Sequence, residues 1–140
     1  MSPDKAKQIR SSFSAQSLMA TLGAEIALLE RGTVEIRAPI LPGSRQQHGI
    51  AHAGLTFSIG DSAAGYAALS TMPDGYEVLT TEMKINLLAP AKGDYLIARG
   101  RVIKPGRRLV IVQADVFAVE TDEETHVALL TGTMMPMAPA

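Results

Sequence analysis

The stretch GLTFSIGDSAAGYAALS, residues 54–70, decides how this chain folds, because it is long, free of proline and almost entirely small and apolar. Its alanines favour a helix about 25 Å long, although three glycines weaken that preference. The stretch is apolar on all sides, which predicts a helix enclosed by other elements rather than one lying on a surface. Residues 72–75, Met-Pro-Asp-Gly, then end it with residues typical of a turn.

Segments that favour β-strands lie on both sides of this helix. Residues 24–40 indicate two strands around a turn at Glu30-Arg31-Gly32, and the second half alternates apolar and polar side chains over residues 34–38. Four longer strands are expected after the helix, with a hairpin at Pro105-Gly106-Arg107 between the second and the third of them. Their ranges are 76–90, 94–104, 108–120 and 126–137.

The order of these elements predicts an α+β fold in which a long antiparallel sheet wraps around one central helix. We find no linker that would divide the chain, so residues 1–140 are expected to form a single domain. Residues 4–20 are expected to form one further helix, with Ile9, Phe13 and Leu18 on its apolar side, giving an N-terminal helical extension over residues 1–20.

Composition argues against several classes of protein. The net charge of −1 and the absence of tryptophan argue against a nucleic-acid-binding surface. The N-terminal residues lack the apolar core of a signal peptide, and no apolar run is long enough to span a membrane, so a cytoplasmic location is expected. There is no cysteine, and no glycine-rich nucleotide-binding pattern occurs. We therefore expect neither a metal nor a cofactor.

Asp61 is the one residue within the central helix that carries a charge, and no other charged residue lies between Arg45 and Asp74. Enclosing an unpaired carboxylate in an apolar interior is costly, and no lysine or arginine lies within helical reach of it. A strand serine or threonine, or backbone amides, could satisfy this carboxylate structurally. The alternative is a catalytic carboxylate at the mouth of an apolar pocket. Small neighbours such as Gly65 would leave space for a ligand beside it.

The loop before the helix carries a spaced set of polar residues. Gln46 stands six residues before His52, the tripeptide His52-Ala53-Gly54 follows, and Asp61 comes nine residues after the histidine. This pattern resembles hotdog-fold acyl-CoA thioesterases of the phenylacetate-degradation (PaaI) type, which have a polar amide residue, His-Gly-Gly, and an acid on the central helix. The segment MKINLLAPAKGD, residues 83–94, is also similar to the strand after that helix. Gln47 and His48-Gly49 offer a second register.

The resemblance implies an acyl-CoA thioesterase that releases a free acid and coenzyme A. The backbone amides of Ala53 and Gly54 would polarise the thioester carbonyl, and Asp61 would act as general base or nucleophile. Gln46 would orient water or the thioester. Thr80, with Thr81 as the alternative, would place a hydroxyl against the acid.

The resemblance also implies a homodimer, often paired again into a tetramer. Asp61 and Thr80 would come from one subunit, and Gln46 and Ala53 from its partner.

Several residues are expected to bind the substrate or support the site. The acyl pocket is expected near Phe57, Ala64, Tyr66 and the strand 76–88. His52 is expected to anchor its loop by hydrogen bonds, since it is not part of a metal-ligand cluster. The hairpin residues Lys104, Arg107 and Arg108 either bind the phosphates of coenzyme A or form a solvated basic turn.

Two other functions are compatible with the same fold. One is a non-catalytic module that binds an acyl or aryl ligand. The other is a hotdog enoyl-CoA hydratase or dehydratase, although the loop motif of those enzymes is not found here.

Overall fold

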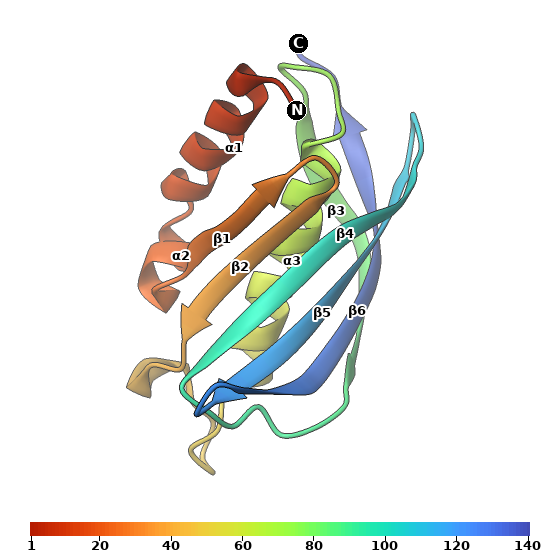
Figure 1. Ribbon diagram of the computed structural model, residues 1–140. Helices are drawn as coiled ribbons and strands as arrows, with labels where there is room; N and C mark the ends of the chain where they lie inside the picture. Colours follow the sequence, from red (N-terminus) through yellow and green to blue (C-terminus); the bar gives the residue numbers. More distant parts are fainter.

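The computed structural model describes every residue of the chain, 1–140. The helices are α1 (Pro3–Ala15), α2 (Ser17–Leu22) and α3 (Ala53–Leu69), with a short 3-10 turn at Pro42–Ser44. The strands are β1 (Glu25–Glu30), β2 (Thr33–Pro39), β3 (Glu77–Leu87), β4 (Tyr95–Pro105), β5 (Val110–Glu120) and β6 (Glu123–Met137). Both ends of the chain lie at the same end of the molecule (Figure 1).

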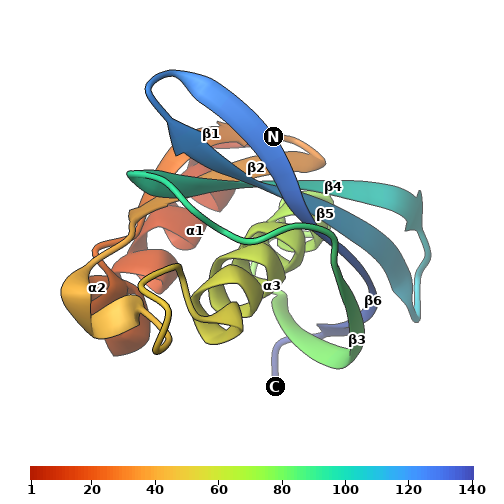
Figure 2. The same cartoon turned by 90° about the horizontal axis from the view of Figure 1, so that it is seen from below.

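The six strands form one antiparallel sheet in the order β1-β2-β4-β5-β6-β3. The sheet curves around α3, which lies on its concave side, with α1 and α2 beside it (Figure 2). This arrangement confirms the predicted α+β hotdog architecture of a single helix wrapped by a long sheet. No helix is long and apolar enough to cross a membrane.

Helix α3 packs closely on the sheet because glycines permit it. A Cβ atom on Gly100 of β4 would lie 2.4 Å from the carbonyl carbon of Ala63, so only glycine lets this strand approach the helix backbone. A Cβ atom on Gly60 would lie 2.7 Å from a methyl group of Leu130. Ile59, Ala63 and neighbouring residues of α3 are completely buried, and they form the centre of the apolar core.

The N-terminal extension differs from the single helix expected over residues 4–20. The helix ends at Ala15, because Gln16 adopts an extended backbone, and a second helix starts at Ser17. Ile9 is fully buried and Phe13 packs against the core, as expected, but Leu18 is half exposed. The side chain of Gln16 donates a hydrogen bond to the hydroxyl of Tyr66 on α3, so the break directs this residue towards the central helix.

Strand β3 is one edge of the sheet and is largely exposed. Its backbone pairs only with β6, so its other side offers free N–H and C=O groups. Leu79 and Leu87, together with the adjoining Leu88, are each more than half exposed. A long edge strand with exposed leucines is a typical surface for association with another chain.

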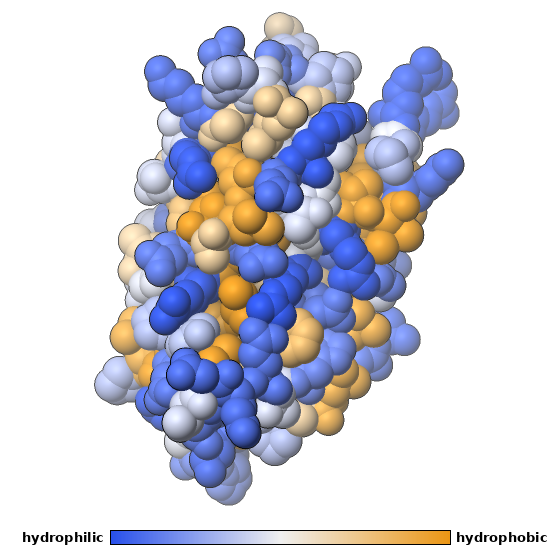
Figure 3. Space-filling view, viewed as in Figure 1, coloured by the Kyte–Doolittle hydropathy of each residue, from blue (hydrophilic) through white to orange (hydrophobic).

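A second group of exposed apolar side chains lies beside the β4–β5 hairpin. Ile103, Leu109 and Ile111 are each between 40% and 50% exposed. In the space-filling view, apolar surface is visible just below this hairpin, next to the charged side chains at its tip (Figure 3).

Candidate active site

The carboxylate of Asp61 lies in the middle of α3 and faces strand β3. The hydroxyl of Thr80 donates a hydrogen bond of 2.8 Å to its Oδ1 atom. The carboxyl group is half-buried, and no lysine or arginine pairs with it. A single hydroxyl is therefore its only side-chain partner, and the second carboxylate oxygen is free to contact a ligand.

A β-bulge in β3 separates the roles of the two neighbouring threonines. The register of β3 against β6 shifts between Thr80 and Glu82, which leaves Thr81 as the extra residue. The Thr81 hydroxyl donates to the carbonyl of Thr133 on β6, at 3.0 Å, and so does not reach the acid. Of the two candidates, Thr80 is the residue that faces Asp61.

Asp61 opens into a cavity of about 180 Å³, called the acid cavity below. The expectation of an apolar pocket beside Asp61 is wrong, because most of the residues that line this cavity are polar. Beside Asp61 and Thr80 it includes Ser12, Gln16, Ser62 and Glu77. Gly65 and Tyr66 also line it, whereas Ala64 is fully buried, and Phe57, one turn before Asp61, is exposed and does not line the cavity.

Ser12 and Gln16 were not predicted as site residues. They belong to α1 and its C-cap, 49 and 45 residues before Asp61 in the sequence, and no spacing rule connects the two segments. The only sequence signal is that Ser12 and Gln16 each follow an apolar residue, Ile9 and Phe13, by three positions, which puts them on the same side of the helix. They reach the acid cavity because α1 packs beside α3.

Burial raises the pKa of the Asp61 carboxyl above its usual value of 3.8, and the hydrogen bond from Thr80 partly opposes this increase. The cause is desolvation, since an apolar or enclosed environment disfavours the charged form. A carboxylate with a raised pKa is a better proton acceptor, which suits a general base.

Replacing Thr80 with valine is expected to shift the acid limb of the pH–activity profile to higher pH. The Thr80 hydroxyl stabilises the ionised carboxylate, so its removal raises the pKa of Asp61 further. Because a general base works only when ionised, activity then falls at a higher pH as the solution is acidified. The measurement is kcat/KM against pH. Thr81→Val is the matched control and should leave the acid limb in place, and an unmoved limb in Thr80→Val would contradict the assignment.

The start of α3 presents one unpaired backbone amide. His52 is the N-cap, and its Nδ1 atom accepts a hydrogen bond of 2.7 Å from the amide of Gly54. The Ala53 amide, at the first helical position, forms no hydrogen bond within the chain. This differs from the expectation that both amides would be available, because the imidazole of His52 takes one of them. His52 also donates its own amide to the carbonyl of Ser44, which fixes the loop.

Alanine fits at position 53 without strain. The only non-glycine residues with positive φ are Thr121 and Asp122, so Ala53 has the ordinary backbone conformation of a helix start. A side chain is therefore tolerated where the PaaI-type pattern has glycine. Residues 53 and 54 are exposed at the surface.

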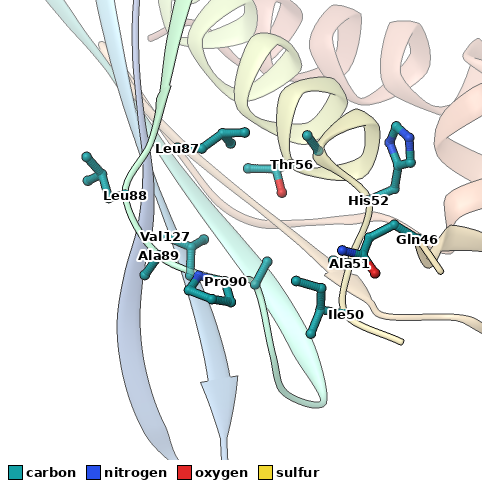
Figure 4. Close-up of a pocket in the computed structure, with 12 residues that line it drawn as sticks. Gln46, Ile50, Ala51, His52, Thr56, Leu87, Leu88, Ala89, Pro90 and Val127 are labelled. Carbon is teal, nitrogen blue, oxygen red and sulfur yellow. The ribbon is translucent and has the colours of Figure 1, made fainter. Parts of the chain in front are cut away.

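Gln46 lies in the loop that leads to this helix end. Its side-chain Oε1 atom accepts a hydrogen bond from the backbone amide of His48, and its backbone N–H donates to the carbonyl of Ile50. Gln46, His52 and Ala53 line a second cavity of about 500 Å³, called the loop cavity, together with the apolar residues Leu87 and Leu88. Figure 4 shows Gln46 and His52 on one side of this cavity and the two leucines across from them.

The two groups of candidate catalytic residues thus lie in separate cavities of one chain. Asp61 and Ala53 are eight residues apart on the same helix, which corresponds to about 12 Å along its axis. A thioester bound at Asp61 cannot at the same time place its carbonyl oxygen on the Ala53 amide of the same chain. The acid cavity holds Asp61 and Thr80, and the loop cavity holds Gln46 and Ala53, so neither contains all of the expected catalytic groups.

The hairpin residues Lys104, Arg107 and Arg108 are exposed and lie at the opposite end of the sheet from the loop cavity. Arg107 lines a separate depression beside Met72 and Tyr76. Within a single chain the structure does not bring these cations to Gln46 or Ala53. No group of three or more histidine, aspartate or glutamate side chains is arranged to hold a metal ion.

This fold, with an acid on the wrapped helix, defines a hotdog enzyme of the thioester hydrolase class, and comparison with known proteins assigns the family. Residues 48–125, more than half of the chain, match the model of the thioesterase superfamily. The chain belongs to this superfamily.

Individual relatives agree with the assignment. The crystal structure of a thioesterase family protein from Silicibacter pomeroyi is 43% identical, covers 96% of this chain and 98% of that one, and superposes with a TM-score of 0.93. A curated protein of Saccharolobus solfataricus, "Putative esterase SSO2140", is 31% identical over 80% of either chain. The E. coli PaaI protein shares the fold, with a TM-score of 0.85 at 21% identity over 98% of this chain and 96% of that one.

Proposed function

We propose that this protein hydrolyses acyl-CoA thioesters to a free acid and coenzyme A, at sites formed between two copies of the chain. The observation that carries the proposal is that the candidate base and the candidate oxyanion donor lie at different positions along α3, in separate cavities. A half-buried carboxylate held by Thr80 lies in one cavity, and an unpaired helix-start amide lies in another. Each is incomplete alone, and a two-fold dimer would complete both.

The exposed edge of strand β3 indicates where the two copies would associate. Antiparallel pairing of two β3 strands satisfies their free backbone groups and covers the exposed Leu79 and Leu87. Such a pairing reverses one copy relative to the other. The start of α3 in one copy then approaches the middle of α3 in its partner, which brings the Ala53 amide towards the partner's Asp61.

The reaction follows from these groups. The thioester carbonyl oxygen accepts a hydrogen bond from the Ala53 amide at the positive end of α3, which stabilises the negative charge that develops on it. Asp61 removes a proton from water as the water attacks the carbonyl carbon, or attacks that carbon itself to form an anhydride that water then cleaves. The carbon–sulfur bond breaks, and the coenzyme A thiolate leaves and takes up a proton. Gln46 orients water or the thioester from the loop.

A thiol-release assay tests the proposed function directly. Acyl-CoA thioesters with aromatic and C4 to C16 acyl groups are mixed with the protein and a thiol-reactive dye. We expect free thiol to appear for at least one of them. A folded protein that binds acyl-CoA without releasing thiol would identify a binding module instead, and hydration of an enoyl-CoA would identify a hydratase.

The reversed arrangement of the two copies also gives the basic hairpin a role. It places the hairpin end of one chain at the same end as the loop cavity of its partner, so Arg107 and Arg108 could contact the phosphates of coenzyme A. Replacing both with glutamate should raise KM for acyl-CoA about tenfold or more, with little change in kcat.

The control for this prediction is Lys7→Glu with Arg10→Glu. These residues are exposed on α1, and the change in net charge is the same. An equal rise of KM in the control would mean that the effect comes from overall charge. An unchanged KM in the hairpin variant would assign Arg107 and Arg108 to a solvated turn.

A further inference from the structure

The acid cavity contains a polar group of side chains that the hydrolysis itself does not use. Tyr66, only 4% exposed, directs its hydroxyl towards α1. The side-chain amide of Gln16 donates to this hydroxyl at 2.5 Å, and the Ser12 hydroxyl lies 3.0 Å from it. Phe13 packs edge-on against the Tyr66 ring, with centroids 6.1 Å apart, which fixes its position. All three polar side chains line the same cavity as Asp61.

This polar cluster lies at a defined distance beyond the acid. Tyr66 is five residues after Asp61 on α3, which is about 7.5 Å along the helix axis. An extended chain advances about 1.2 Å per bond, so roughly six bonds, from the thioester carbonyl carbon to an oxygen on the sixth carbon, cover that span. The cavity volume of about 180 Å³ is similar to the roughly 150 Å³ of an engineered protein cavity that binds benzene. The space suits a short acyl group.

Gly65 keeps this space open. A glycine within a helix costs about 0.5–1 kcal/mol relative to alanine, so its presence needs a reason. Close packing is not the reason here, since an added Cβ atom would meet only a methyl group of Met134 at an ordinary 3.8 Å. Gly60 and Gly100 differ, because a Cβ atom at either position would clash. Gly65 lies one turn after Asp61, on the side that lines the cavity.

The charges around the cavity restrict the ligand further. Glu77 and Asp61 line it, and no lysine or arginine does. A carboxylate at the far end of the acyl group would lie in a cavity that already holds two acidic residues and no compensating cation. A neutral hydroxyl can instead donate to the Gln16 side-chain oxygen or exchange hydrogen bonds with Ser12 and Tyr66.

From this we infer that the acid cavity selects a short acyl group that carries a neutral hydroxyl at its far end, with Ser12, Gln16 and Tyr66 as the recognition cluster and Gly65 providing the space. The inference rests on the proposed thioester hydrolysis and adds its substrate class. It gives the N-terminal extension a function, because two of the three recognising residues come from α1 and its C-cap.

Three matched thioesters test this selectivity: hexanoyl-CoA, 6-hydroxyhexanoyl-CoA and adipyl-CoA, which ends in a carboxylate. We expect kcat/KM for the hydroxylated chain to exceed that for hexanoyl-CoA about tenfold, as one further hydrogen bond would give. Adipyl-CoA should be the poorest of the three. Tyr66→Phe combined with Gln16→Met, which preserves side-chain size, should bring the ratio of hydroxylated to plain chain close to one. Ser11→Ala, on the exposed side of α1, is the control and should leave the ratio unchanged.

Gly65→Ala tests the space independently of the hydrogen bonds. The added methyl group should leave Tm unchanged or higher while lowering kcat/KM for all three thioesters at least about threefold. A variant with unchanged kcat/KM would show that the acyl group does not use this part of the cavity.

Failure of the inference and failure of the proposed function give different results. Hydrolysis of hexanoyl and 6-hydroxyhexanoyl thioesters at equal kcat/KM, or a preference that survives in the Tyr66 and Gln16 double variant, would overturn the inference alone. If no thioester is cleaved, the hydrolytic function fails, and calorimetric titration of the same compounds decides the selectivity. Tighter binding of the hydroxylated compound would then support the recognition cluster, and equal affinities would overturn it.

Discussion

Replacing Asp61 with asparagine is expected to lower kcat for acyl-CoA hydrolysis by about 10³-fold, within the usual contribution of general acid–base catalysis. Asparagine has the same shape and can still accept the Thr80 hydrogen bond, but it can neither take a proton nor attack the carbonyl. The measurement is thiol release at saturating substrate, with acyl-CoA binding followed separately by calorimetry. We expect the affinity to remain within a few-fold of the wild type.

The same substitution should not destabilise the protein. Burial raises the pKa of Asp61 on folding, so this group stabilises the fold most below its unfolded pKa and loses that contribution as the pH rises through its folded value. At pH 7 the charged carboxyl is therefore unfavourable in the fold, and a neutral amide removes the penalty. Tm at pH 7 should stay the same or rise.

Asp122→Asn is the matched control for both measurements. Asp122 lies in the exposed β5–β6 turn with a positive φ, a conformation that asparagine adopts readily. It should leave kcat unchanged. Near wild-type turnover by Asp61→Asn would remove this carboxylate from the mechanism.

Replacing Ala53 with proline is expected to reduce kcat by about 10²- to 10³-fold, the usual cost of removing one oxyanion donor. Proline lacks the backbone N–H, and this is the amide that forms no hydrogen bond within the chain. The fold should tolerate the change, because proline is favoured at the first position of a helix. His52, the preceding residue, already has the extended backbone (φ −64°, ψ 143°) that proline requires before it.

Two measurements separate the missing amide from a structural effect. Tm and the circular dichroism spectrum of Ala53→Pro should match those of the wild type. Ala53→Gly, which retains the N–H, should keep most of the wild-type kcat. If the proline variant hydrolyses acyl-CoA at the normal rate, the carbonyl oxygen is bound elsewhere.

Local sequence patterns predicted the part of the fold that carries the acid. The apolar stretch 54–70 forms α3 within one residue at each end, because its composition and its flanking turn both favour that helix. The four strands after it begin and end within a few residues of their expected bounds. The pairing of Thr80 with Asp61 was expected from the family resemblance, and the β-bulge explains why Thr80 rather than Thr81 makes it.

Features that depend on tertiary contacts were not predictable in this way. The helix break at Gln16 has no proline or glycine to indicate it, and the contact of this side chain with Tyr66 accompanies it. Two of the polar residues that line the acid cavity, Ser12 and Gln16, come from α1 and its C-cap, a segment remote in sequence from α3. The capture of the Gly54 amide by His52 depends on the side-chain conformation of the N-cap, which spacing does not specify.

Subunit complementation between the two inactive variants tests the shared site most directly. Asp61→Asn and Ala53→Pro chains carrying different tags are co-expressed, and the heterodimer is isolated through both tags. If each active site is formed by both chains, one of the two sites in the heterodimer combines the intact Asp61 of one chain with the intact Ala53 amide of the other. The heterodimer should therefore recover about half of the wild-type kcat per dimer. A heterodimer no more active than its parents would contradict a site formed between two chains.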